Sequence, residues 1–132
     1  PYFVPVEHTA FAREALGDGP LLAPEQAVVL ETDPDRARAI ARTHTAIYTG
    51  LPNYTNNLRR FGFEDEDFAN AGSDRLVDAI VAWGDIDAVT ARVRAQLDGG
   101  ASHVCVQALG ATDFAVTADE WRELAPALLE LA

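Results

Sequence analysis

A near-continuous apolar run, Gln26–Glu31, constrains the fold of this chain more than any other feature of its sequence. Asp33 and Pro34 follow the run as a helix N-cap and a first helical residue. A strand that is apolar on both sides is typical of the middle of a parallel sheet, because helices cover both faces there. The sequence therefore predicts a central parallel strand that leads directly into a helix.

Two other apolar runs, Pro1–Val4 and His103–Gln107, also have strand composition. Helical patterns separate all three runs, so the order is strand, helix, strand, several helices, strand, helix. Alternation of this kind is typical of parallel β/α units with right-handed crossovers. The predicted fold class is therefore α/β with parallel strands.

Start and stop signals place the helices between the runs. Pro5 and Gly17 enclose a predicted helix over Val6–Leu16. The remaining start signals are Asp33, Ser73 or Asp74, Asp85 and a capping-box sequence at Thr117, and the remaining stop signals are Gly50, Gly84 and Gly99. On this interpretation Leu76, Val77, Ile80 and Val81 form the apolar stripe of one helix that ends at Gly84.

Three strands cannot close a parallel barrel, which takes eight strands and typically about 250 residues. The chain has 132 residues, so it forms either a small open sheet or the last part of a larger barrel. Because the chain opens on the apolar run Pro1–Val4, we expect upstream sequence to be missing. Residues 1–132 are then one partial domain.

The charge of the chain limits its partners. The net charge is −11, and all ten cationic residues are arginines. A field of this sign repels a phosphate backbone, so the sequence disfavours nucleic-acid binding. No apolar run approaches the roughly 20 residues that span a bilayer, and the single cysteine, Cys105, fits a reducing cytoplasm.

The segment Leu51–Phe63 (LPNYTNNLRRFGF) is the most specific passage of the chain. It is followed by Ala82–Asp85, an amphipathic helix, Gly99–Ala101 and His103–Gln107. This succession resembles the luciferase-like monooxygenase superfamily, in particular its branch that uses coenzyme F420. The passage of Pro1–Val4 into a helix is similar to the sixth strand and helix of that family.

The resemblance implies that the chain is the C-terminal part of a (β/α)8 TIM barrel and carries strands six to eight with their helices. It implies hydride transfer between a deazaflavin, coenzyme F420, and an organic small-molecule substrate; FMN is the alternative cofactor. Chemistry in such barrels lies at the carboxyl ends of the strands. The main phosphate loop belongs to the first five units, so a missing N-terminal barrel half is an implied partner, and the isolated chain is expected to be inactive.

Four residues are implied to contact the cofactor: Tyr2, Phe3, Glu31 and Gln107. Tyr2 and Phe3 would lie near the top of strand six against the flat ring; the alternative, which ordinary burial favours for aromatic residues, is core packing at the end of that strand. Glu31 ends strand seven, where it either binds a hydroxyl group or is a solvated charge before the Asp33 cap. Gln107 is the polar residue nearest the catalytic end of strand eight.

Three residues of the specific passage are implied to contact the substrate: Asn53, Tyr54 and Asn57. Their amides and phenol would lie near the mouth of the barrel and could hydrogen-bond a polar ligand. The alternative is a helix-packing motif in which Asn53 is the N-cap after Pro52.

No metal site is predicted, because His8, His44 and His103 do not have the spacing of ligand pairs. His44 lies in an apolar helical stripe and is interpreted as a core histidine. Cys105 is interpreted as a small buried residue.

A different class of function stays open beside the oxidoreductase. A three-stranded sheet has two unpaired edges, which invite a partner strand. The alternative function is therefore a non-catalytic α/β assembly module, which would form a homo-oligomer.

Overall fold

The computed structural model describes residues 1–111 and 116–131. Its strands are β1 (Glu25–Leu30), β2 (Val81–Gly84) and β3 (Cys105–Ala108). Its helices are α1 (Val6–Leu16), α2 (Pro34–Tyr48), α3 (Pro52–Arg59), α4 (Asp65–Phe68), the 3-10 helix η1 (Ala69–Ala71), α5 (Asp74–Ile80), α6 (Ile86–Asp98) and α7 (Ala118–Leu129).

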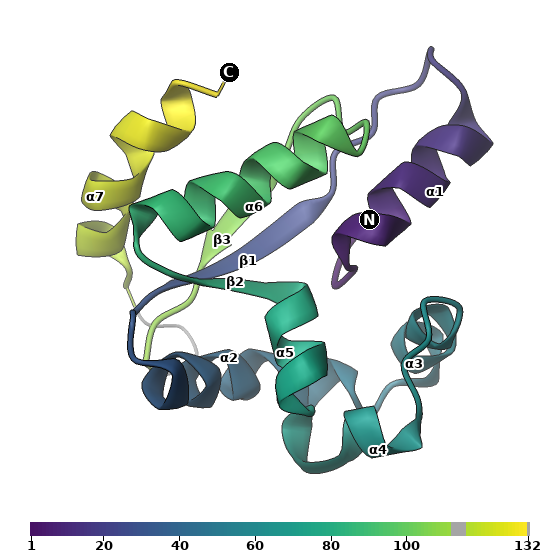
Figure 1. Cartoon of the computed structure of the whole chain (residues 1–132), viewed down its shortest axis with the longest axis horizontal. Coiled ribbons are helices and arrows are strands. Elements are labelled where there is room, and N and C mark those ends of the chain that lie inside the picture. The colour runs from purple at the N-terminus through teal and green to yellow at the C-terminus, as the bar shows by residue number, and fades with distance from the viewer. Residues whose placement is uncertain (112–115, 132) are drawn as a thin grey trace.

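Within the described residues, the three strands form one parallel sheet in the order β2-β1-β3. Val28, in the central strand, pairs with Ala82 on one side and with Ala108 on the other. The helices α2 and α5 lie on one face of the sheet, and α6 and α7 lie on the other (Figure 1). The predicted α/β class with parallel strands is therefore confirmed.

The prediction of a strand at Pro1–Val4 is wrong. These residues form no strand, and Phe3 has a φ of 56°, in the left-handed region that an extended strand excludes. The strand missing from the prediction is β2, whose residues were assigned to the end of a helix. That helix, α5, ends at Ile80, and the chain continues as a strand to Gly84.

The order of the strands differs from the order expected for part of a barrel. In a (β/α)8 barrel, strands that follow one another along the chain are neighbours in the sheet. Here the first strand lies between the second and the third. The crossover from β1 to β2 uses α2 to α5 on one face, and the crossover from β2 to β3 uses α6 on the other. This arrangement is a small open, doubly wound sheet.

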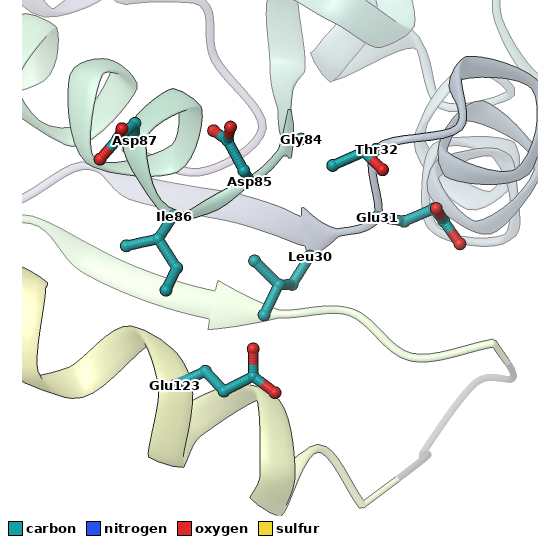
Figure 2. A pocket seen from close by; sticks show the side chains of 8 residues that line it. All are labelled: Leu30, Glu31, Thr32, Gly84, Asp85, Ile86, Asp87 and Glu123. Atoms are coloured by element: carbon teal, nitrogen blue, oxygen red, sulfur yellow. The ribbon is translucent and has the colours of Figure 1, made fainter.

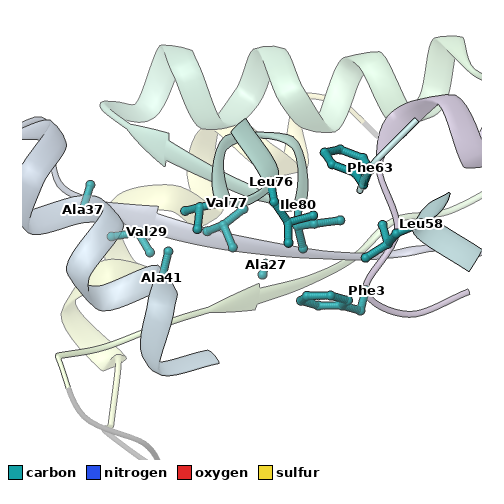
Figure 3. Close-up of a cluster of buried hydrophobic side chains, with 11 residues drawn as sticks. Phe3, Ala27, Val29, Ala37, Ala41, Leu58, Phe63, Leu76, Val77 and Ile80 are labelled. Carbon is teal, nitrogen blue, oxygen red and sulfur yellow. The ribbon is translucent and has the colours of Figure 1, made fainter. Parts of the chain in front are cut away.

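Two apolar clusters hold the helices on the sheet. The larger one lies between the sheet and the helices on the α2 side (Figure 3). Its buried members are Phe3, Ala27, Val29, Ala37, Ala41, Leu58, Phe63, Leu76, Val77, Ile80 and Val81. The smaller one joins the opposite face to α6 and α7 through Val28, Ala82, Val89 and Leu124. Both faces of β1 are therefore covered, as its apolar composition predicts.

Most of the predicted helix starts are confirmed by hydrogen bonds. The side chains of Asp33, Ser73 and Asp85 accept from the main-chain N–H three residues ahead, which is the geometry of an N-cap. Thr117 precedes α7 without a capping side-chain hydrogen bond, so the predicted capping box is wrong. Among the described residues, no helix is long and apolar enough to cross a membrane.

Candidate functional site

A pocket of about 560 Å³ opens at the carboxyl ends of β1 and β2, between the first turn of α6 and the helix α7 (Figure 2). Parallel sheets commonly bind ligands outside this edge. The residues that line the pocket are Leu30, Glu31, Thr32, Gly84, Asp85, Ile86, Asp87 and Glu123. Two neighbouring strands and two helices therefore converge on one cavity.

Two helix starts form the rim of the pocket. After β1 the chain turns into α2, where the carboxylate of Asp33 accepts from the main-chain N–H of Arg36 at 2.9 Å. After β2 it turns into α6, where the carboxylate of Asp85 accepts from the N–H of Ala88 at 2.9 Å. The turn at Gly84 is tight: its φ is 133°, and a Cβ atom there would lie 2.8 Å from the Cβ of Ala88. Gly84 therefore lets α6 start directly beside the sheet.

The pocket combines an apolar floor with acidic walls. Leu30 and Ile86 supply the apolar surface, and the acidic side chains are Glu31, Asp85, Asp87 and Glu123. In Figure 2 the carboxylate of Glu123 points from α7 toward Leu30. The negative charge disfavours a phosphate and favours ligand groups that donate hydrogen bonds.

Glu31 and Asp85 are already engaged within the chain. Arg36 donates to Oε1 of Glu31 at 3.0 Å, and the N–H of Asp33 donates to the same oxygen at 2.9 Å. These hydrogen bonds, of which the one from Arg36 is the strongest influence, lower the pKa of Glu31. Asp87 and Glu123 form no ion pair with another described residue, so their carboxylates are the acceptors available to a ligand.

Of the residues predicted to contact a cofactor, only Glu31 lines this pocket. Tyr2 and Gln107 are brought together elsewhere: the hydroxyl of Tyr2 donates to Oε1 of Gln107 at 3.1 Å. Tyr48, which the sequence did not single out, donates its hydroxyl to that of Tyr2 at 3.1 Å. Burial and the hydrogen bond with Tyr48 raise the pKa of Tyr2, so its phenol is the protonated donor at neutral pH.

Phe3 belongs to an aromatic cluster on the α2 side of the sheet. It is fully buried, with ring centroids 4.7 Å from Tyr48 and 5.7 Å from Tyr54. His44 is buried beside these rings, 5.0 Å from Tyr48, which confirms its interpretation as a core histidine. The cluster lies near the amino end of β1, because the N–H of Glu25 donates to the carbonyl of Pro1. Tyr2 and Phe3 are therefore not at the carboxyl edge, contrary to the expected position.

The predicted substrate residues lie on α3, which Figure 1 shows at the side of the molecule away from the carboxyl ends of the strands. Asn53 is exposed and Asn57 is half-buried. Asn53 is not an N-cap, because α3 begins at Pro52 after Leu51. Tyr54 packs in the aromatic cluster, 5.0 Å from the ring of Tyr48. The structure thus separates this group from the pocket that contains Glu31.

Cys105, predicted to be buried, is exposed on β3. Sequence reasoning also missed most of the pocket, because Val81–Gly84 was assigned to a helix.

No family model, curated protein or solved structure matches this chain. Its function is therefore inferred from the pocket and the sheet. In the described ranges, no group of three or more histidine, cysteine, aspartate or glutamate side chains is placed to hold a metal ion.

Proposed function

We propose that this chain is part of a luciferase-like oxidoreductase that transfers a hydride between coenzyme F420, or alternatively FMN, and an organic substrate. The observation that carries the proposal is the pocket at the carboxyl ends of two parallel strands, with Glu31 in its wall. Barrel enzymes act at this edge of their strands. The sequence of Leu51–Phe63 supports the same family.

Within this proposal the pocket takes the ring of the coenzyme or the substrate, and not the phosphorylated tail. Leu30 and Ile86 offer an apolar surface to a flat ring, and Asp87 and Glu123 accept hydrogen bonds from hydroxyl or amine groups. Phosphate binding is assigned to β/α units outside these 132 residues. The lone cysteine of the chain fits the cytoplasm as the place of this reaction.

A barrel also implies a different strand order. It requires β2 to lie between β1 and β3, whereas β1 lies between them in this sheet. We therefore propose hydride transfer at the carboxyl edge of this open sheet and not a barrel order of its strands. The hydride-transfer part depends only on the carboxyl edge, which both arrangements share.

Coenzyme binding tests the proposal. F420 and FMN are titrated separately with the protein, and a saturable change in coenzyme fluorescence is expected for one of them. Asp87→Asn, in the pocket, should change the dissociation constant several-fold. Asp98→Asn, at the exposed far end of the same helix, is the matched control and should leave it unchanged. If neither coenzyme shows saturable binding, the proposal fails.

A second function, a non-catalytic assembly module, is favoured by one observation. The strand β3 is at the edge of the sheet, with Cys105 exposed and Val106, Gln107 and Ala108 only half-buried. A strand in this position is a template for another strand.

A further inference from the structure

A second pocket, of about 440 Å³, lies at the β2 edge of the sheet. There β2 joins α5 to α6, which lie on opposite faces of the sheet (Figure 1). The lining residues that decide the chemistry of this pocket are Asp78, Trp83, Ala88, Ala91, Arg92 and Ala95. It shares no lining residue with the pocket at the carboxyl ends of β1 and β2, so it is a separate candidate site.

Part of the wall of this second pocket is apolar. Ala88, Ala91 and Ala95 of α6 are spaced three and four residues apart, so they share one face of the helix. Their methyl groups leave space beside the sheet that longer side chains would fill. The half-buried ring of Trp83 adds an aromatic surface, and Arg38 lies over this ring at 5.2 Å. The pocket therefore has room for an apolar body, aromatic or branched.

Arg92 brings a positive charge to the same pocket. Its guanidinium donates to the main-chain oxygens of Asp78 and Ala79, at 2.7 and 2.9 Å. Both of these acceptors are uncharged, and Arg92 forms no ion pair with another described residue. A guanidinium has five N–H groups, and Arg92 uses two of them in this way. The others are available to a ligand.

The positive charge of Arg92 is largely withdrawn from water without a carboxylate bound to it. Burial lowers the pKa of Arg92, and Glu7 and Asp78 oppose this effect only through space. Asp78 is already engaged: its two oxygens accept from Arg38, at 3.0 and 2.6 Å, and one of them also accepts from the ring N–H of Trp83 at 2.7 Å. A cation in such a position is costly unless it is paired. An anion that enters the pocket would offset this cost.

We propose that the pocket at the β2 edge binds a small organic carboxylate with an apolar body. The carboxylate accepts from the N–H groups of Arg92 that the main chain leaves free, and the body lies against Trp83 and the alanine face of α6. Arginine binds phosphate groups as well. The carboxylate of Asp78 in the wall and the net charge of −11 favour a singly charged ligand over a doubly charged phosphate.

Titration with a matched series of probes tests this site. The compounds 3-phenylpropionate, 3-phenylpropanol and 3-phenylpropylamine share one skeleton and differ in the charge of the head group, and 4-methylpentanoate offers a branched body. The chain has two tryptophans, so a Trp121→Phe background makes its fluorescence report Trp83 alone. Both carboxylates should give a saturable change. The alcohol should bind at least about 10-fold more weakly than 3-phenylpropionate, and the amine should not bind saturably.

Two substitutions locate the bound carboxylate. Arg92→Gln should weaken the binding of 3-phenylpropionate at least about 10-fold, because it removes the charge. Since Arg92 also holds the end of α5, Ala91→Phe provides a test that leaves Arg92 in place. Ala91 is exposed and lines the pocket, so the added ring should fill the space and weaken binding to a similar degree. The matched control, Ala46→Phe, adds the same ring at an exposed position of α2 and should bind like wild type.

Three outcomes would overturn this proposal. One is that neither carboxylate binds saturably to the wild type, and another is that 3-phenylpropylamine binds as tightly as 3-phenylpropionate. The third is an Ala91→Phe variant that is folded by circular dichroism and keeps the affinity of the wild type. The inference does not depend on hydride transfer, because coenzyme binding is measured by coenzyme fluorescence and the two pockets share no lining residue. Either proposal can therefore fail without the other.

Discussion

The side-chain amide of Gln96 donates a hydrogen bond to Oε1 of Gln26 over 3.0 Å, and this bond joins α6 to β1 inside the core. Gln26 in turn donates to the main-chain oxygens of Ala27 and Ile80, each at 2.9 Å. The hydroxyl of Thr9 donates to Oε1 of Gln96 at 2.6 Å. The three side chains are at most 1% exposed. A single hydrogen-bonded chain therefore links α1, α6, β1 and the end of α5.

Replacing Gln96 should test how strongly this chain of hydrogen bonds stabilises the fold. Gln96→Leu keeps an apolar side chain of similar size but leaves Gln26 and Thr9 each without one buried partner. Each of these two unsatisfied groups costs about 1–3 kcal/mol, so we expect a loss of roughly 2–6 kcal/mol in the free energy of unfolding. Urea unfolding followed by circular dichroism measures it.

Arg94→Gln, at an exposed position of the same helix, is the control for this experiment and should change the stability by less than about 0.5 kcal/mol. Equal stabilities for Gln96→Leu and Arg94→Gln would show that the buried hydrogen bonds contribute no net stability.

Glu25, at the amino end of β1, is half-buried, and the Oε1 atom of its carboxylate is fully buried. Burial raises its pKa from 4.5 to about 7, although a hydrogen bond from the N–H of Phe3 acts in the opposite direction. Because the pKa is higher in the folded chain, the unfolded chain loses this proton at lower pH. Folding stability should therefore decrease as the pH rises from about 4.5 to 7, and this decrease should end above pH 7.

Glu25→Gln should remove this pH dependence. The variant and the wild type are expected to be similarly stable below pH 4.5, and the variant should be more stable at pH 8 by up to about 3 kcal/mol. Urea titrations at pH 4, 6 and 8 measure the difference, with the exposed Glu14→Gln as control. Parallel stability profiles for wild type and Glu25→Gln would contradict the raised pKa.

Local signals in the sequence predicted the helices well. Pro5 and Gly17 bracket α1 as expected, and Asp33 and Asp85 cap α2 and α6 by their own side chains. These signals act between residues one to four positions apart, so a single sequence contains the information. The apolar run around Val28 likewise predicted a central strand, because burial on both faces requires apolar residues at every position.

The sequence was less informative where distant segments decide the outcome. Ile80–Trp83 is a short apolar run that fits either a helix end or a strand, and pairing with β1 makes it a strand. At the start of the chain, the positive φ of Phe3 follows from its fit into the aromatic cluster, which no local pattern shows. The order β2-β1-β3 and most of the pocket depend on these long-range contacts. Glu31 was found because it directly follows a recognisable strand.

Asp67 forms an ion pair with Arg75, and this pair offers a second test of how charge contributes to stability. Its carboxylate accepts from the hydroxyl of Ser73 at 2.6 Å, from the N–H of Glu64 at 3.0 Å and from the Arg75 guanidinium. These hydrogen bonds lower the pKa of Asp67 from 3.8 to about 2, and the bond from Arg75 has the largest effect. Its stabilising contribution is therefore complete above pH 3.8 and is lost as the pH falls through 2.

Asp67→Asn should lower the free energy of unfolding at pH 7 by about 1–2 kcal/mol, near the low end for hydrogen bonds to charged groups because Arg75 is exposed to solvent. The difference from wild type should shrink between pH 4 and pH 2. Thermal unfolding at pH 7, 4 and 2 checks both points, and Glu66→Gln, an exposed neighbour, should behave like wild type. A difference that stays constant down to pH 2 would assign the loss to packing and not to charge.

Gly84 is the residue on which the shape of the pocket depends most directly. Its φ of 133° is one that other residues rarely adopt, and an added Cβ would lie 2.8 Å from the Cβ of Ala88, closer than real Cβ contacts. Gly84→Ala should therefore cost about 2–4 kcal/mol in stability and move the start of α6 away from β2. Gly50→Ala is the matched control: Gly50 has no positive φ and nothing within 4 Å of the added atom, so its replacement should be neutral or stabilise by about 0.5 kcal/mol.

The two substitutions also distinguish an effect on folding stability from an effect on ligand binding at the pocket. If the pocket binds the coenzyme or substrate, Gly84→Ala should weaken ligand binding even under conditions where the variant is fully folded, because α6 carries Asp87 and Ile86 into the wall. Gly50→Ala, between α2 and α3, should bind like wild type. Denaturant unfolding gives the stability of each variant, and coenzyme titration below the unfolding transition gives the affinity. Equal affinities for folded Gly84→Ala and Gly50→Ala would place ligand binding outside this pocket, because a displaced α6 cannot leave the wall unchanged.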